Sequence, residues 1–213
     1  GEGSYGEMAV SSFGSFGVDT EHVHVVPGES GVAPIWVEPD GTNRIIIVPG
    51  ANNGLTAEMA SDAVASSAGL SVVVGQLEAP PAATAAGFAE ARSRGVLTVL
   101  NPAPAAELEP ALLAVTDWLI PNEVEFGLLA HGAEPDDAAI VEYSERTGTR
   151  LLVTLGGDGV AVVCDDGSVS RIAADVVEAV DTTGAGDVYH GAYLVGLLKG
   201  WELEFIAQFA TAV

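Results

Sequence analysis

Helix-like and strand-like segments alternate through the middle of this chain, and this order restricts the fold more than any other feature. Apolar residues at helical spacing are followed each time by a short apolar run, at 57–68 and 71–75, 81–93 and 96–100, and 106–115 and 117–120. Consecutive parallel strands need a crossover, which is usually a helix and right-handed. The sequence therefore predicts an α/β fold with a mainly parallel sheet covered by helices on both faces.

The flanking segments extend this pattern. Further helices are expected at 4–16, 123–131, 136–147, 185–199 and 203–212, and further strands at 22–26, 151–155, 160–164 and 168–172. Two runs, 35–38 and 44–48, are joined by the turn-forming residues 39–42, which is typical of a β hairpin.

Size and composition exclude several classes of protein. A chain of 213 residues with 48% hydrophobic residues can fill a sizeable core. No run of about 18 apolar residues occurs, and the chain does not open on a charged and then apolar stretch, so we expect neither a membrane partner nor a signal peptide. Cys164 is the only cysteine, which rules out an internal disulfide, and its apolar surroundings predict a buried strand thiol. We therefore expect a folded cytoplasmic protein.

Acidic residues dominate the charge, since 30 Asp and Glu against 7 Lys and Arg give a formal net charge of −23. Such a field repels nucleic acid, so none is expected as a partner. The acids are spread along the chain, as expected of a halophilic protein working where the screening length is about 3 Å at 1 M salt. An ordinary acidic protein whose charge serves solubility is the alternative, and full stability without salt would favour it.

The strongest chemical motif is DTTGAGD at 181–187, expected between a strand ending at Val180 and a helix beginning near Ala185. The amides of Gly184, Ala185, Gly186 and Asp187 would point at an anion from a helix N-terminus. Such an anion hole stabilises the charge that develops during phosphoryl transfer, and Asp187 could accept the proton of an attacking hydroxyl. The alternative is a glycine-rich helix start with a capping aspartate.

The longer segment DTTGAGDVYHGAYL resembles the signature of the ribokinase family of carbohydrate kinases, with Tyr189 at a position where the family usually has phenylalanine. Similarity extends over most of the chain, through GVDTEHV, VGQLEAP, LNPAPA, PNEVEFGLL and VTLGGDGV. The resemblance implies a ribokinase-like three-layer sandwich with a mainly parallel central sheet and a small β lid. Residues 1–213 would form a single domain truncated at both ends, and the hairpin at 32–49 would contribute to the lid and pair two subunits as a homodimer.

The resemblance also implies an activity, the transfer of a phosphoryl group from ATP to a sugar hydroxymethyl group. QLEAP and NPAPA look most like members that act on D-ribose and make ribose 5-phosphate. Fructokinase, ketodeoxygluconate kinase and nucleoside kinase remain alternatives within the family. A catalytically impaired relative that only binds sugar or nucleotide is the alternative from another class, because the family's N-terminal sugar-binding part is absent.

On the nucleotide side, the resemblance implies that Asn122 contacts the phosphates and that Glu125 organises Mg²⁺ through water. Their spacing of three also fits a helix capping box, and the two interpretations are compatible. The adenosine side of ATP would lie against the turn after 151–155, with contributions from Thr154, Leu155, Gly156, Gly157, Asp158 and Gly159, and from Gly186 in the anion hole. A strand follows this turn, so it is not a dinucleotide fingerprint.

On the sugar side, the resemblance assigns hydroxyl binding to Glu78 together with Asp187, although a solvated loop acid would also explain Glu78. Asp181 and Thr183 resemble part of a monovalent cation site that would hold K⁺ as an activator.

The histidines allow several interpretations. His22 and His24 would share one face of a strand, but a zinc site would need a third ligand. His190 lies one turn after Asp187 and is expected to pack or cap rather than to catalyse.

Overall fold

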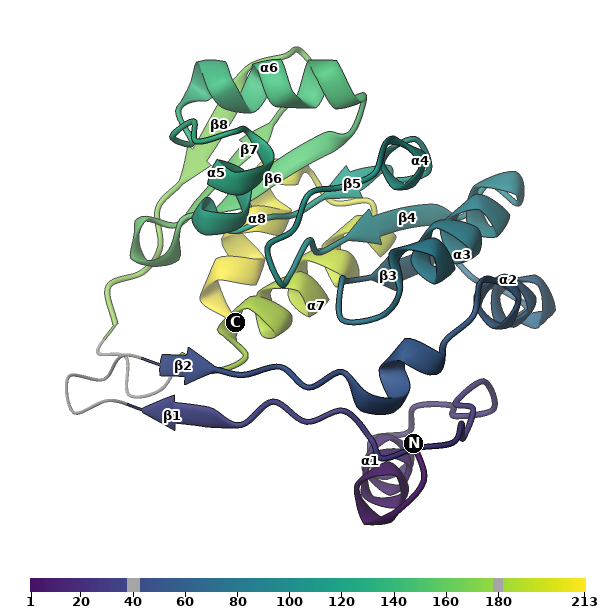
Figure 1. Ribbon diagram of the computed structural model, residues 1–213. Coiled ribbons are helices and arrows are strands. Elements are labelled where there is room, and N and C mark those ends of the chain that lie inside the picture. The colour runs from purple at the N-terminus through teal and green to yellow at the C-terminus, as the bar shows by residue number, and fades with distance from the viewer. Residues whose placement is uncertain (38–42, 178–181) are drawn as a thin grey trace.

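The computed structural model describes residues 1–37, 43–177 and 182–213. Its centre is a six-stranded sheet in the order β3-β4-β5-β6-β7-β8 (Figure 1). The strands are β3 (Val72–Gly75), β4 (Leu97–Leu100), β5 (Trp118–Leu119), β6 (Arg150–Thr154), β7 (Val160–Val163) and β8 (Val169–Ile172). The first four are parallel, whereas β7 is antiparallel to both of its neighbours. The predicted mainly parallel sheet is confirmed.

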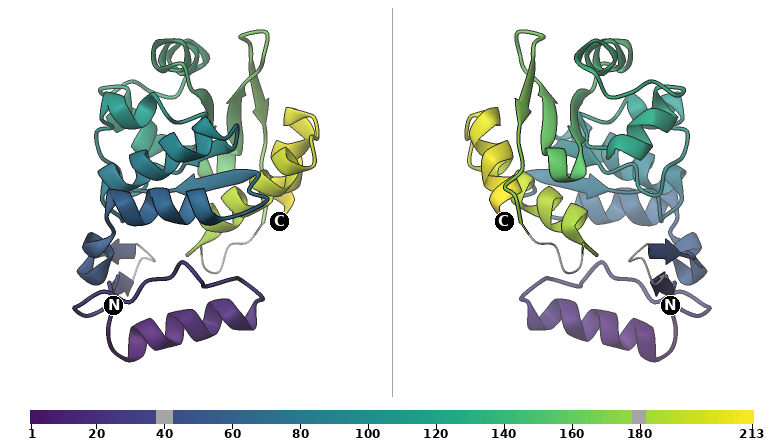
Figure 2. Two further views of the ribbon diagram at one scale, coloured as in Figure 1. Left: turned by 90° about the vertical axis from the view of Figure 1, so that its right-hand side faces the viewer. Right: turned by 90° about the vertical axis from the view of Figure 1, so that its left-hand side faces the viewer.

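Helices cover both faces of this sheet, which Figure 2 shows almost edge-on between two helical layers. One layer holds α2 (Ala57–Ser66), α3 (Pro81–Ser93), α4 (Pro110–Leu113), α5 (Glu123–Leu129) and α6 (Asp137–Thr147). The other layer holds α7 (Ala185–Leu198) and α8 (Leu203–Ala212). The bounds of α3 and α8 match the predicted ranges, because both helices begin and end where their apolar pattern does.

Alternate side chains of the strands face the two layers, which produces two cores. On β6, Leu152 packs in the core with Tyr193 of α7 and Ile206 of α8. Its neighbours Leu151 and Val153 pack in the opposite core with side chains of α3, α5 and α6. Because both faces are covered, the strand is apolar at successive positions instead of alternating. Each fully buried side chain of this size stabilises the fold by roughly 1.5–3 kcal/mol.

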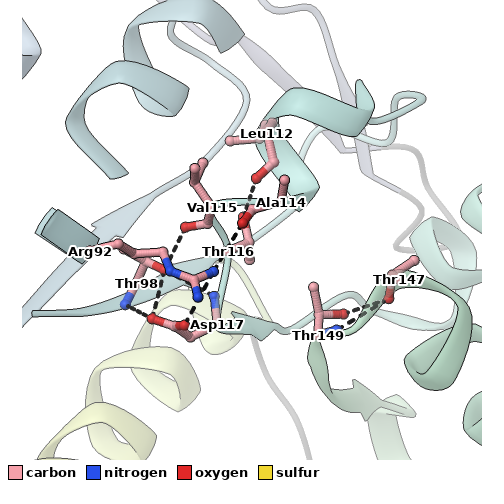
Figure 3. A network of polar contacts seen from close by, with 9 residues as sticks. All are labelled: Arg92, Thr98, Leu112, Ala114, Val115, Thr116, Asp117, Thr147 and Thr149. Atoms are coloured by element: carbon pink, nitrogen blue, oxygen red, sulfur yellow. Dashed lines mark hydrogen bonds and ion pairs between the residues drawn. The ribbon is translucent and has the colours of Figure 1, made fainter. Parts of the chain in front are cut away.

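The amino ends of the central strands are joined by a polar network (Figure 3). The Asp117 Oδ2 atom accepts hydrogen bonds from the Thr98 amide at 2.9 Å and from its hydroxyl at 3.0 Å. The Asp117 amide donates to Thr98 Oγ1 at 2.9 Å, and Arg92 Nη1 lies 3.6 Å from Asp117 Oδ1. The network satisfies buried groups between β4 and β5 at the end of the sheet opposite the loops described below.

A separate two-stranded antiparallel sheet pairs β1 (Ile35–Val37) with β2 (Asn43–Ile45). In Figure 1 this small sheet lies outside the main body, on the side where α7 begins. The predicted hairpin is thus confirmed in its strands, while its predicted turn at 39–42 lies outside the described residues. The helix α1 (Ser4–Ser15) and the short 3₁₀ helix η1 (Gly50–Gly54) flank the two strands in sequence.

Three local predictions are wrong. Residues 22–26 are irregular, because no described strand offers them a ladder of hydrogen bonds. The helix predicted at 106–115 is reduced to α4, since Pro110 lacks an amide hydrogen and fits only the first turn of a helix. Strand β7 ends at Val163, so Cys164 follows the strand and is half-buried.

No helix in the described ranges is long and apolar enough to cross a membrane.

Candidate active site

Four loops meet at the carboxyl edge of the parallel strands. They follow β3, β4, β5 and β6, and the chain also leaves β8 at this edge on its way to α7, because β8 runs parallel to β6. Ligands of open α/β sheets bind at this edge, and the described site residues that the sequence predicts lie in these connections, at the end of β6 or in the first turn of α7.

The start of α7 has the geometry of an anion-binding turn. Gly184 caps the helix with φ 77°, a left-handed conformation that favours glycine. A Cβ atom added at Gly184 or at Gly186 would meet no heavy atom within 4 Å, so the turn is open to an incoming group. Within the described part of the chain, no acceptor is found for the amides of Gly186 and Asp187. Amides in the first turn of a helix have no acceptor within that helix, so these two donors are available to a ligand at the start of α7, where the helix dipole favours an anion.

One detail of the predicted anion hole is wrong. The Ala185 amide donates to the Thr182 carbonyl at 3.2 Å, so it is engaged within the turn rather than free. The Asp187 side chain is exposed in the same turn, close in sequence to the remaining donors. The strand predicted to end at Val180 and the candidate cation ligand Asp181 lie outside the described residues. Thr183 is described and exposed.

Asn122 and Glu125 form the predicted capping box at the start of α5. Asn122 Oδ1 accepts from the Glu125 amide at 2.8 Å, and Glu125 Oε2 accepts from the Asn122 amide at 2.8 Å. Glu125 is 5% exposed, and burial raises its pKa, while the bond from the Asn122 amide and the nearby His190 act in the opposite direction. The box uses one oxygen of each side chain. Within residues 1–37, 43–177 and 182–213, no further hydrogen bond involves the Asn122 amide nitrogen or Glu125 Oε1, so both atoms could contact a ligand.

The glycine turn after β6 lies beside this box. The Thr154 amide donates to the Pro121 carbonyl at 3.0 Å, and Asn122 and Thr154 form an isolated parallel bridge. The turn itself is the 3₁₀ helix η2 (Gly156–Asp158), and Leu155 donates across it to the Gly159 carbonyl at 2.8 Å. The predicted strand, turn and strand are confirmed.

Gly159 is required for this turn on steric grounds. Its φ is 92°, and a Cβ atom there would clash with the carbonyl oxygen of Ile172 on β8. Any other residue at 159 would push β8 away from the turn.

Glu78 lies in the loop after β3, and Asp187 lies at the start of α7. Glu78 is half-buried in its loop, where the Leu77 amide donates to the Ala103 carbonyl at 2.8 Å. It borders a hollow of about 490 Å³ between β3, α2, α3 and the segment with His22 and His24. Asp187 does not line that hollow. The structure thus puts the two predicted sugar-binding residues at the same sheet edge without joining them in one cavity.

His22 and His24 both border this hollow, from irregular chain instead of a strand. Across residues 1–37, 43–177 and 182–213, no group of three or more His, Cys, Asp or Glu side chains could hold a metal ion.

His190 contributes more to this edge than its sequence position indicates. Its Nδ1 lies 2.6 Å from the Gly186 carbonyl oxygen, and its Nε2 lies 3.1 Å from the Ile120 carbonyl oxygen. The first contact follows from helical spacing and fits the predicted packing or capping role. The second joins residues 70 apart, so no local pattern could have found it.

The mostly parallel sheet, its two helical layers and the open glycine turn at its carboxyl edge define a three-layer α/β protein with an exposed helix start at that edge. A model of the pfkB family carbohydrate kinases matches residues 1–213. The chain belongs to this family, and it is therefore a carbohydrate kinase.

Sequences of known enzymes are similar to this one over nearly its whole length. Ribokinase from Haemophilus influenzae is 31% identical over 217 residues, which cover 100% of this chain and 71% of that protein. Deoxyribokinase from Salmonella typhi is 32% identical over 211 residues, covering 96% of this chain and 68% of that protein.

A solved structure of Arabidopsis thaliana ribokinase complexed with ribose and ATP superposes with a TM-score of 0.81 at 25% identity, covering 100% of this chain and 71% of that one. The α/β fold, with its small two-stranded sheet as a lid, is the ribokinase-like fold.

Proposed function

We propose that this protein transfers the terminal phosphoryl group of ATP to the hydroxymethyl group of D-ribose, giving ribose 5-phosphate and ADP. The hydroxymethyl oxygen attacks the terminal phosphorus, the bond from phosphorus to the ADP oxygen breaks, and the hydroxyl proton passes to Asp187. The proposal rests above all on the first turn of α7, where Gly186 and Asp187 are exposed and, among the described residues, their amides have no acceptor.

The chemistry of that turn suits an in-line phosphoryl transfer. Negative charge spreads over the phosphoryl oxygens in the transition state, and preorganised amides stabilise it there more than in the ground state. A carboxylate in the same turn can take up the proton of a hydroxyl that approaches the phosphorus. In this proposal the amides of Gly186 and Asp187 form the anion hole, Gly184 and Ala185 shape the turn that presents them, and the Asp187 carboxylate serves as general base and as a sugar contact.

The nucleotide would lie along the edge from α7 to the turn after β6. Asn122 would face the phosphates with its side-chain NH₂ group, and residues 154–159 would border the adenosine side. Mg²⁺, when bound, neutralises phosphate charge and orients the phosphoryl group. Glu125 would fill this role through bridging water, with Oε1 as the contact, because the Asn122 amide already engages its Oε2.

The sugar would lie between α7 and the loop after β3, with Glu78 accepting bonds from its hydroxyl groups. Because Glu78 and Asp187 do not share a cavity in the described residues, closure of the β1 and β2 lid would complete this part of the site. Exposed apolar side chains on that lid, among them Trp36 at 53% and Ile45 at 55%, support a role in covering the sugar and in pairing two subunits. Asp181 and Thr183 would contribute to a K⁺ site that activates the enzyme.

Deoxyribose is the second candidate substrate, because the deoxyribokinase relative is as similar as the ribokinase relatives. Fructose, ketodeoxygluconate and nucleosides complete the panel. We further propose one domain over 1–213 and a cytoplasmic location.

Sugar-dependent release of ADP, measured in KCl with each member of this panel, tests the proposal. We expect D-ribose to give the highest kcat/KM. A higher value with 2-deoxyribose would move the assignment to that sugar. Binding of nucleotide without turnover of any sugar would leave a binding protein and refute the kinase assignment.

A further inference from the structure

His190 connects two loops that the proposed function assigns to the same ligand. It is half-buried in the second turn of α7. One ring nitrogen contacts the carbonyl of Gly186 in the phosphate-binding turn, at 2.6 Å, and the other contacts the carbonyl of Ile120 at the end of β5, at 3.1 Å. Both partners are fixed backbone acceptors, so the ring sets the distance between the turn and the strand end.

The connection continues beyond Ile120. Pro121 and Asn122 come next in the chain, and Asn122 closes the capping box with Glu125. The Pro121 carbonyl in turn accepts from the Thr154 amide at 3.0 Å. A single side chain therefore joins the start of α7 to the start of α5, and through it to the glycine turn after β6.

The surroundings of Glu125 support this connection. Burial raises the pKa of Glu125, and the charge of His190 is one of the influences that lower it. The imidazole thus lies near enough to the buried carboxylate to interact with it, as well as with the two carbonyl groups.

We propose that His190 is a positioning residue that holds the phosphate-binding turn of α7 in register with the Asn122 and Glu125 loop, so that both loops contact one nucleotide phosphate chain. This inference rests on the proposed function. His190 itself touches neither nucleotide nor sugar in this account. It acts through Gly186 on one side and Ile120 on the other.

Two substitutions separate positioning from simple packing. His190→Phe keeps a ring of similar size but has no group that can bond to either carbonyl. His190→Gln has a terminal NH₂ with two donors that can bond to these carbonyls. His131→Asn is the control, because His131 lies exposed in the α5 to α6 connection with φ 54°, a conformation that Asn tolerates.

The measurement is the affinity for ADP with and without Mg²⁺, by calorimetry, with thermal unfolding of each variant alongside. We expect His190→Phe to bind Mg·ADP about tenfold more weakly, the loss of roughly one to two net hydrogen bonds. His190→Gln should recover most of the affinity, and His131→Asn should match the wild type. The gain in ADP affinity from Mg²⁺ should also shrink in His190→Phe, because Glu125 acts on the metal side.

A second readout is the coupling between His190→Phe and Glu125→Gln. If the two residues act through one loop, the double variant changes the Mg²⁺ dependence of ADP binding by less than the sum of the changes in the two single variants. Wild-type Mg·ADP affinity in folded His190→Phe, or strictly additive effects, would overturn the positioning role while leaving the proposed function intact. A wild-type protein that binds no Mg·ADP would refute the proposed function and this inference with it.

Discussion

Two tyrosine hydroxyl groups in the α7 core have no hydrogen-bond partner among the described residues, those of Tyr189 and Tyr193. Tyr193 is fully buried, and its ring packs edge-on against Trp118 at 5.5 Å and stacks on Tyr189 at 6.1 Å. A buried hydroxyl that gives up water without gaining a partner costs about 1–3 kcal/mol. Tyr193→Phe removes the hydroxyl and keeps both ring contacts. We expect the free energy of unfolding to rise by about 1–2 kcal/mol, and Tm by roughly 2–8 °C.

The effect of Tyr193→Phe on the free energy of unfolding should also depend on pH in the alkaline range. Burial raises the pKa of Tyr193 above its usual range, first through desolvation and then through the neighbouring Tyr189. Because the folded state keeps the Tyr193 phenol protonated, the free energy of unfolding does not depend on this group below the pKa of the unfolded phenol, near pH 10. Above that pH the unfolded phenol ionises while the folded one does not, so stability falls by about 1.4 kcal/mol per pH unit. Tyr193→Phe removes this loss for one group.

The assay is urea unfolding at pH 7 and at pH 10.5 in the same high concentration of KCl. The advantage of Tyr193→Phe should be larger at pH 10.5 than at pH 7. Tyr5→Phe is the control, because Tyr5 is 56% exposed and its hydroxyl reaches water. A variant less stable than the wild type at pH 7 would show that the Tyr193 hydroxyl has a partner and would refute the reasoning.

Three further predictions concern the loops. Gly159→Ala should lower the free energy of unfolding, measured by chemical denaturation, by about 2–4 kcal/mol, because the new Cβ clashes with the Ile172 carbonyl at a positive φ. Gly157→Ala should cost far less, because a Cβ at Gly157 meets no atom within 4 Å. Equal losses of stability in the two variants would contradict the steric argument. Glu125→Gln should raise the Mg²⁺ concentration needed for half-maximal ADP release more than it changes the sugar KM, and an unchanged Mg²⁺ requirement would leave Glu125 a capping residue only. Raising the KCl concentration should strengthen ATP binding or leave it unchanged, because the net charge of −23 repels the nucleotide and no lysine or arginine occurs in 121–125, 153–160 or 181–187. A steep loss of ATP affinity in folded protein would reveal a cationic group at the site. A salt of an organic cation at equal ionic strength separates charge screening from K⁺ binding.

Several elements could be predicted from the sequence because local signals agree with the tertiary fold. The capping box at Asn122 and Glu125 is such a case, since its spacing, side chains and hydrogen bonds all point to a helix start. The glycine at 184 is another, because the helix start needs a left-handed residue there. The strands of the central sheet are apolar on both faces, so their presence was predictable.

Other features depend on contacts distant in sequence and could not be predicted. Residues 22–26 have strand-like composition, but a strand exists only with a partner beside it, and composition does not specify one. The bond from His190 to Ile120 and the engagement of the Ala185 amide by Thr182 likewise follow from how segments meet in space. The sugar side of the site is the least predictable, because the distance between Glu78 and Asp187 is set by the whole sheet edge and by the lid.

Asp187→Asn tests the central claim most directly, through a comparison of sugar-dependent ADP release and ATP affinity with the wild type. The substitution keeps the shape of the first turn of α7 and its amides, but removes the proton acceptor. We expect ATP affinity to stay within about twofold and kcat with D-ribose to fall by about two to four orders of magnitude. Near-normal turnover by Asp187→Asn would remove this carboxylate from the reaction and contradict the account of the site.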